Sequence, residues 1–136
     1  MKFKVGSLPL IILLAACLNA PLQAQLQEKV SKDWPGFGVL QGRWQRPDGG
    51  YIIEIKNINH LGKMEMAYFN PRPIHVAKAD AARDGKTIKI FIELRDINYP
   101  GSKYNLTYDP KSDQLKGTYF QAFLKQTFEV VFDRLK

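Results

Sequence analysis

Residues 87–94 read Thr-Ile-Lys-Ile-Phe-Ile-Glu-Leu, with an aliphatic side chain at every second position. An extended chain points alternate side chains to opposite faces, so Ile88, Ile90, Ile92 and Leu94 share one face. Asp84-Gly85 stands just before this run and is typical of a tight hairpin turn. The stretch therefore predicts one strand of an antiparallel hairpin, with one apolar face.

The same alternation continues from Val39 to the end of the chain, interrupted by turn residues such as Pro47-Asp48-Gly49-Gly50. It predicts strands at 39–46, 51–57, 63–69, 74–82, 87–94, 103–108, 114–121 and 127–134. Nearly every strand carries charge on the face opposite its apolar face, which favours an apolar interior. The predicted fold is all-β, an up-and-down antiparallel barrel of about eight strands with a short N-terminal helix.

Two details of the strand pattern lead to separate expectations. The segments 70–73 (Asn-Pro-Arg-Pro) and 99–102 (Tyr-Pro-Gly-Ser) are expected to end strands, because proline lacks the N–H group that a central strand donates. Within 74–82, Ile74 and Val76 set one phase of the alternation, whereas the three alanines at 77, 79 and 81 suit the other. A β-bulge in this strand would reconcile the two phases.

The N-terminus has the composition of an export signal. Lys2 and Lys4 precede an apolar run over residues 8–18. This run is too short for a membrane-spanning helix, which needs roughly 20 residues. Residues 14–17 (Leu-Ala-Ala-Cys) resemble the lipobox of bacterial lipoproteins, in which Cys17 would carry the lipid. Residues 22–24 (Leu-Gln-Ala) resemble an ordinary signal-peptidase site. The sequence leaves both cleavage sites open, so the expected location is the periplasm, or the outer membrane if Cys17 is lipidated.

Three segments follow from these patterns. Residues 1–24 are the predicted signal peptide, 25–38 a short helix and linker, and 39–136 the barrel domain. The helix is predicted because Leu26, Val30 and Trp34 recur every four residues before Pro35-Gly36.

Composition and motifs exclude several classes of function. The chain has 136 residues, 20 Lys+Arg against 13 Asp+Glu, and one cysteine, so an internal disulfide framework is impossible. His60 and His75 are the only histidines, with no carboxylates at metal-ligand spacing, and no metal or other cofactor is expected. No nucleophile elbow or phosphate-binding loop is present, so we expect no enzyme. Basic residues are spread over strands and turns and interleaved with acidic ones, which predicts no nucleic-acid binding.

Residues 42–44 (Gly-Arg-Trp) resemble the Gly-x-Trp signature of the calycins, the lipocalin and avidin-like barrels. The resemblance implies structural roles for Gly42, Trp44 and Arg134. In these barrels the tryptophan packs across one end, and an arginine of the last strand stacks on it or bonds nearby backbone. Typical lipocalins are longer and have a C-terminal helix that this chain lacks.

Two functions are compatible with such a barrel. The first is binding of a small amphipathic or hydrophobic ligand by lumen and rim side chains, with an amphipathic anion such as a fatty acid as the first candidate. The predicted contacts are Trp44, Tyr68, Arg72, Arg95, Tyr99, Tyr104 and Tyr119. The second is an envelope interaction protein with a filled barrel, for example an inhibitor of a cell-wall lytic enzyme. Its support is the outward apolar set Ile52, Phe69, Phe91, Phe120 and Val131, which could also form a homodimer. Membrane contact is expected only through a lipid anchor.

Overall fold

The computed structural model describes Lys2, Gly6, residues 21–25 and residues 36–136. Cys17, the whole apolar run at 8–18 and nearly all of the helix predicted within 25–34 lie outside the described residues, so these features stay predictions. Within the described part of the chain, no helix has both the length and the apolar character needed to cross a membrane.

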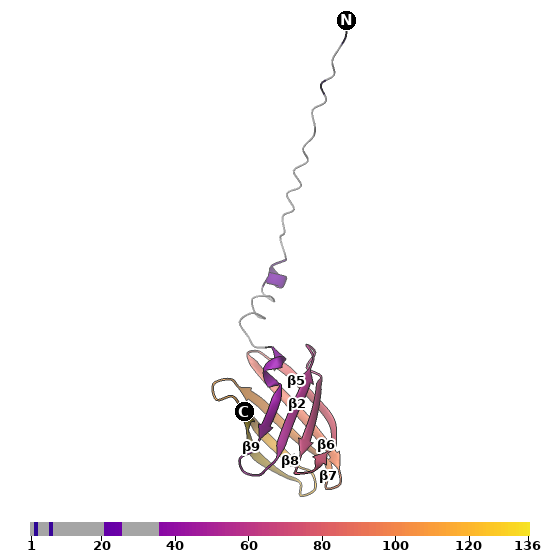
Figure 1. Ribbon diagram of the computed structural model, residues 1–136, viewed down its shortest axis with the longest axis vertical. Helices are drawn as coiled ribbons and strands as arrows, with labels where there is room; N and C mark the ends of the chain where they lie inside the picture. Colours follow the sequence, from indigo (N-terminus) through magenta and orange to yellow (C-terminus); the bar gives the residue numbers. More distant parts are fainter. Residues whose placement is uncertain (1, 3–5, 7–20, 26–35) are drawn as a thin grey trace.

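The described residues form one antiparallel sheet that curves into a nearly closed barrel (Figure 1). Among the described residues, a helical stretch at 22–25 and the 3-10 turn η1 (Phe37–Leu40) precede the first strand. The strands are β1 (Gly42–Gln45), β2 (Ile52–Ile58), β3 (Met64–Phe69), β4 (Pro73–Ile74), β5 (Val76–Asp84), β6 (Thr87–Asp96), β7 (Tyr99–Asp109), β8 (Gln114–Gln121) and β9 (Gln126–Leu135). Their order in the sheet is β4-β3-β2-β1-β9-β8-β7-β6-β5. The predicted all-β antiparallel barrel is confirmed.

The strand count differs from the prediction because the strand predicted at 74–82 is divided at His75. Ile74 in β4 pairs with Tyr68 of β3, whereas Val76 begins the pairing of β5 with β6. The register of β5 shifts between Val76 and Lys78, which is the bulge that the change of phase predicts. The described residues thus contain nine strands instead of eight, and the predicted N-terminal helix is not confirmed.

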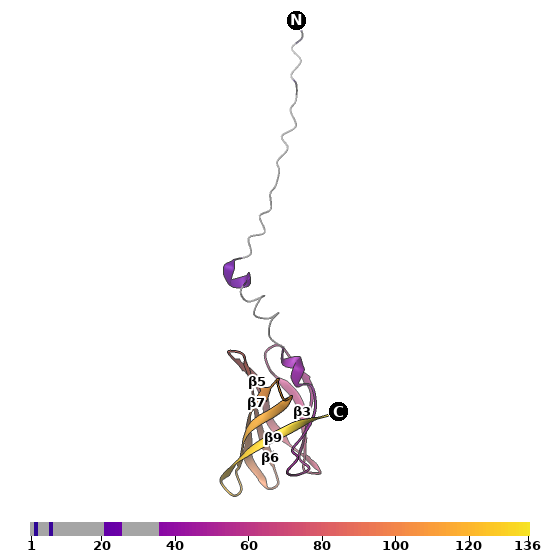
Figure 2. The same cartoon turned by 90° about the vertical axis from the view of Figure 1, so that its left-hand side faces the viewer.

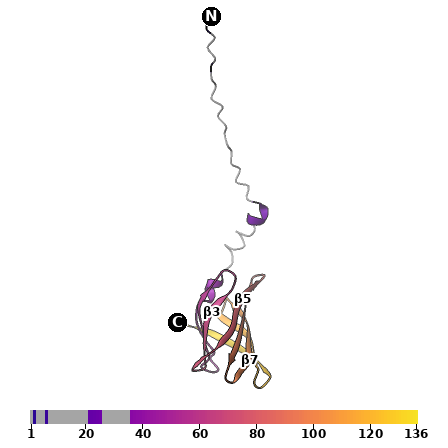
Figure 3. The ribbon, with the colours of Figure 1, turned by 90° about the vertical axis from the view of Figure 1, so that its right-hand side faces the viewer.

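The barrel closes along a short seam between β3 and β5, which face the viewer in Figure 3. Lys63 and Asp80 form an isolated antiparallel bridge there, and their side chains make an ion pair of 2.8 Å. The N–H of Ala81 donates to the carbonyl of Gly62 at 2.7 Å. Gly62 has φ +84°, and a Cβ at this position would stand 1.9 Å from the Ala81 carbonyl oxygen. Only glycine permits this approach, because it has no Cβ and adopts positive φ without strain.

The predicted start of the first strand and the predicted strand end at 99–102 were both wrong. Val39 and Leu40 belong to η1, which lies at the barrel end where β1 begins (Figure 2). The segment at 99–102 does not end a strand, because β7 begins at Tyr99 and includes Pro100. Pro100 pairs with Arg95 of β6. On its other side it has no partner, because the pairing of β7 with β8 begins only at Lys103. A proline tolerates a position that has a neighbouring strand on only one side.

The predicted apolar face is the core of the barrel. The alternating residues of β6 (Ile88, Ile90, Ile92 and Leu94) are all buried. The other buried apolar residues are Leu40, Trp44, Ile53, Ile55, Tyr68, Ile74, Ala81, Tyr104, Leu106, Tyr108, Leu115, Tyr119, Val130 and Phe132. Phe128 shares the phase of Val130 but is 42% exposed, because it stands near the start of β9 at the barrel end opposite η1.

Candidate functional site

The end of the barrel next to η1, here called the closed end, is fastened by Trp44. Its side chain is fully buried, and its indole N–H donates to the carbonyl of Leu40 at 2.9 Å. The guanidinium of Arg134 lies 4.1 Å from the centre of a Trp44 ring and donates to the carbonyls of Val39 (2.7 Å) and Gln41 (2.8 Å). This arrangement is compatible with a calycin-like barrel.

Gly42 and Asp113 complete the closed end. Gly42 has φ +128°, and a Cβ there would stand 3.1 Å from Nη1 of Arg134. The Asp113 carboxylate accepts hydrogen bonds from Arg134 at 2.7 and 3.0 Å, and these bonds lower the pKa of Asp113. Gly42, Trp44 and Arg134 therefore lie together at the closed end.

The middle of the barrel is crossed by tyrosine side chains. The hydroxyls of Tyr68 on β3 and Tyr104 on β7 are joined by a hydrogen bond of 2.8 Å. The Tyr104 ring stacks on Tyr119 at 4.4 Å and meets the edge of Phe132 at 5.4 Å. Burial raises the pKa of both Tyr68 and Tyr104 above the ordinary value, so both phenols are neutral at physiological pH.

The opposite end of the barrel, here called the mouth, carries the turns at residues 46–51, 70–72, 97–98 and 122–125, at the lower end in Figure 1. A cavity of about 310 Å³ opens there, which is near the small end of the range for ligand pockets. Its lining is rich in hydroxyl, amide and guanidinium groups: Tyr51, Asn70, Arg72, Ile74, Ile97, Asn98, Tyr99, Tyr119 and Gln121. Three residues of the predicted site, Arg72, Tyr99 and Tyr119, meet in this cavity.

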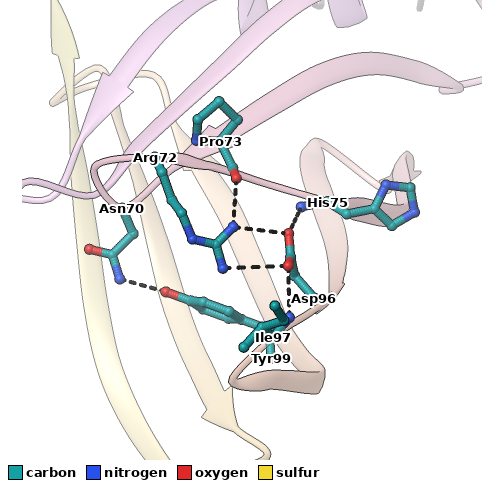
Figure 4. Close-up of polar contacts among 7 residues, drawn as sticks. All are labelled: Asn70, Arg72, Pro73, His75, Asp96, Ile97 and Tyr99. Atoms are coloured by element: carbon teal, nitrogen blue, oxygen red, sulfur yellow. Dashed lines mark hydrogen bonds and ion pairs between the residues drawn. The ribbon is translucent and has the colours of Figure 1, made fainter.

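Asp96 organises one side of the mouth (Figure 4). Its carboxylate accepts the backbone N–H groups of His75 (2.8 Å) and Ile97 (2.7 Å), and the two Nη atoms of Arg72 approach it at 3.4 Å. These contacts, the two backbone donors first, lower the pKa of Asp96 to about 2. Asp96 thus ties the bend between β4 and β5 to the β6–β7 turn.

The same rim holds two further contacts visible in Figure 4. Arg72 also donates to the carbonyl of Pro73 at 3.1 Å, so its guanidinium is fixed by two acceptors. The amide Nδ2 of Asn70 donates to the hydroxyl of Tyr99. Asn70, Arg72 and Tyr99 are thereby held in place before any ligand arrives.

A second cavity of about 310 Å³ adjoins the first and is lined by Arg46, Asp48, Tyr51, Tyr119, Gln121 and Phe128. Arg46 was not among the predicted site residues, because an arginine beside Pro47-Asp48-Gly49-Gly50 is expected to lie in solvent. A signal was available: Arg46 stands two residues after the inward Trp44, in the same phase. Its guanidinium donates to Asp48 at 2.9 and 2.6 Å and to the Tyr104 hydroxyl at 3.2 Å.

The remaining predicted contacts do not line either mouth cavity. Tyr68 and Tyr104 lie deeper in the barrel than the mouth, with at most 1% of their surface exposed, and Trp44 lies at the closed end. Arg95 lies in β6, one position after the inward Leu94, and pairs with Glu93 at 3.1 Å on the outer wall. The predicted set therefore divides into a mouth group, an interior group, a closed-end residue and an outer-wall residue.

Replacing Asp96 should change how stability depends on pH. A carboxyl whose pKa is depressed by folding stabilises the native state above its unfolded pKa of about 3.9, and this contribution is lost as the pH falls toward the folded value. For Asp96 the folded pKa is about 2. We expect Asp96→Asn to lower the urea midpoint at pH 6 but to have little effect near pH 2. If the urea midpoints of the wild type and Asp96→Asn differ by the same amount at every pH, this role of the Asp96 carboxylate is contradicted.

Among the residues that the structure describes, no group of three or more His, Cys, Asp or Glu side chains could hold a metal ion. Neither the protein-family models, nor the curated proteins, nor the solved structures contain a match for this chain.

Proposed function

We propose that this protein is a binding protein whose barrel mouth holds one small amphipathic anion. The observation that carries the proposal is the pair of adjoining mouth cavities, of about 310 Å³ each, which share Tyr51, Tyr119 and Gln121. Ligand pockets of proteins typically combine apolar and aromatic walls with a few fixed polar groups. The mouth offers both kinds of surface within a rigid barrel.

The side chains of the mouth match the two parts of such a ligand. Tyrosine rings, with Ile97 and Phe128, offer apolar faces for a hydrocarbon part. Two guanidinium groups, those of Arg46 and Arg72, line the mouth and suit the anionic part, since guanidinium pairs well with carboxylate or phosphate. The side chains of Tyr68 and Tyr104, joined by a hydrogen bond, fill the barrel interior behind the mouth. The ligand therefore lies across the mouth instead of deep in the lumen.

Three proposals from the sequence accompany this function. The composition of residues 1–24 supports export, with the periplasm or, through lipidated Cys17, the outer membrane as destination. The Gly42-Arg43-Trp44 motif and the stacking of Arg134 on Trp44 support a relationship to the calycin barrels. The absence of a recognisable nucleophile or metal set in the sequence supports a binding role over an enzymatic one.

The test is native mass spectrometry of the protein purified from its own cell envelope. We expect a bound small molecule, and we expect Gln121→Trp to lose it, because Gln121 lines both mouth cavities and an indole would fill them. Gln126→Trp is the matched control, since Gln126 pairs with Gln121 across the β8–β9 hairpin but lines neither cavity. Equal retention of the ligand by the two variants would contradict a mouth site.

A second candidate function, an interaction protein, is favoured by the apolar β8–β9 hairpin at the mouth. Its exposed apolar side chains are Phe120, Phe123, Leu124 and Phe128, and Phe123 is 65% exposed. Phe123 and Leu124 stand together in the β8–β9 turn, and exposed apolar side chains of this kind mark contact surfaces. Recovery of the protein without any bound small molecule would favour this second function, with a partner protein or a second copy covering the hairpin.

A further inference from the structure

We propose that Arg46 is the anchor for a carboxylate ligand, and that Asp48 occupies the place of the ligand's carboxylate in the free protein. The inference rests on the proposed function, because it identifies the charged group of the mouth ligand. It also assigns a regulatory role to the turn between β1 and β2: Asp48 competes with the ligand for one guanidinium.

Arg46 is held in a fixed orientation. Only 9% of its side-chain surface is exposed. Its guanidinium carbon lies 4.4 Å from the ring centre of Tyr51 and 5.8 Å from that of Tyr119, and Nη1 donates to the hydroxyl of Tyr104. A group fixed in this way loses little conformational freedom when a ligand binds.

The edge of Arg46 formed by Nε and Nη2 is covered by Asp48 alone among the described contacts. The two atoms donate to the two carboxylate oxygens of Asp48, at 2.9 and 2.6 Å. This two-point geometry is the one with which a guanidinium binds a free carboxylate. Asp48 therefore shows the position and orientation that a ligand's carboxylate would adopt.

The Asp48 side chain can be displaced into water, whereas the Arg46 side chain is buried and stays in place. The Asp48 side chain is 58% exposed, so water can solvate its carboxylate once it is displaced. It is followed by Gly49 and Gly50, which give the turn the backbone freedom to move. The buried guanidinium would suffer a large penalty without a counter-ion. An incoming carboxylate avoids this penalty, because it replaces one counter-ion with another.

The other arginine of the mouth is less suited to exchange. Arg72 faces Asp96, whose carboxylate is also bound by the backbone N–H groups of His75 and Ile97. Displacing Asp96 would break those two bonds and loosen the bend between β4 and β5. The Asp48 carboxylate accepts a backbone hydrogen bond only from its own N–H among the described contacts, so its displacement unties no other segment, and Arg46 is the exchangeable site.

The cavity beside Arg46 indicates the class of ligand. It measures about 310 Å³ and includes Phe128, whose ring is 42% exposed and available to an apolar tail. A carboxylate with a short hydrocarbon chain fits both the charge and the volume. Longer chains would extend past Phe128 into solvent, because the aromatic side chains below Arg46 fill the interior.

The test is calorimetric titration of sodium octanoate into the wild-type chain and into Asp48→Ala. A binding site that is free for only a tenth of the time weakens the apparent affinity about tenfold, so removing the competing carboxylate should tighten octanoate binding by a similar factor or more. Octyl glucoside, which has the same chain length and no charge, should bind the two proteins equally.

Asp84→Ala is the matched control, because Asp84 is also an exposed aspartate, at the end of β5 beside the β5–β6 turn, and pairs with Lys89 at 2.8 Å, at the closed end. This variant should bind octanoate as the wild type does. In an NMR spectrum, the Nε–H resonance of Arg46 should shift when octanoate is added, which reports on the anchor itself without a substitution at Arg46.

The outcomes separate the inference from the proposed function. Equal octanoate affinity in the wild type and Asp48→Ala, with shifts at Tyr99 and Tyr119 but not at Arg46, would overturn the role of Arg46 and leave the mouth site standing. Failure of both proteins to bind octanoate would also overturn the carboxylate anchor. Native mass spectrometry of the protein purified from its cell envelope would then still decide the proposed function, by showing whether a small molecule is bound.

Discussion

Trp44→Ala is expected to lower the free energy of unfolding by about 3–5 kcal/mol, the usual cost of deleting a large buried aromatic side chain. Trp44 is fully buried, and it packs on Leu40 and against the edge of Tyr108 at 6.1 Å between ring centres. Its loss also removes the surface on which Arg134 stacks. The measurement is urea unfolding followed by far-UV circular dichroism.

Phe123→Ala is the control for this prediction. It removes an aromatic ring of similar chemistry, but Phe123 is 65% exposed, in the β8–β9 turn. A change within about 0.5 kcal/mol is therefore expected, as for most surface substitutions. A loss below about 1 kcal/mol in Trp44→Ala, well under the usual range for such a deletion, would show that the closed end does not depend on its tryptophan. The structural importance of the Gly42-Arg43-Trp44 motif would then be disproved as well.

Local alternation was sufficient to predict most of the barrel wall. The inward residues of β6, from Ile88 to Leu94, are buried as the period of two requires, because backbone geometry alone sends alternate side chains to opposite faces. The contact of Trp44 with Arg134 is different, since it joins the first and last strands. It could be expected only from the family resemblance, because no local pattern specifies which distant strand will pair with β1.

The features that could not be predicted depend on register and on partners across the barrel. The bend at His75 arises because the chain changes its pairing partner there, from β3 before the bend to β6 after it. The pattern of one strand does not reveal its partners. The strand predicted to end at 94 continues to Asp96, and this extension places Arg95 on the outer wall. Arg46 became a site residue because Tyr104, 58 positions away, reaches it across the interior.

The glycine at 117 shows how such a long-range contact can be tested. It lies within β8, where a glycine normally weakens a strand, and its sequence neighbours give no reason for it. In the barrel, a Cβ at Gly117 would stand 1.9 Å from the carbonyl oxygen of Asn105 and 2.9 Å from the Cα of Leu106. Both atoms are backbone of β7, so they cannot turn aside as a flexible side chain would.

Gly117→Ala is therefore expected to cost about 3 kcal/mol, near the upper end of the usual range for overpacking, because β7 and β8 must separate to admit one methyl group. Gly50→Ala is the matched control, since a Cβ at Gly50, in the β1–β2 turn, would meet no atom within 4 Å. Its effect should stay within about 1 kcal/mol, the usual range for a glycine replaced without strain. Urea midpoints of the two variants give the comparison. If Gly117→Ala is as stable as Gly50→Ala, the close approach of β7 and β8 at Asn105 is wrong, because a methyl group cannot occupy space that a carbonyl oxygen already fills.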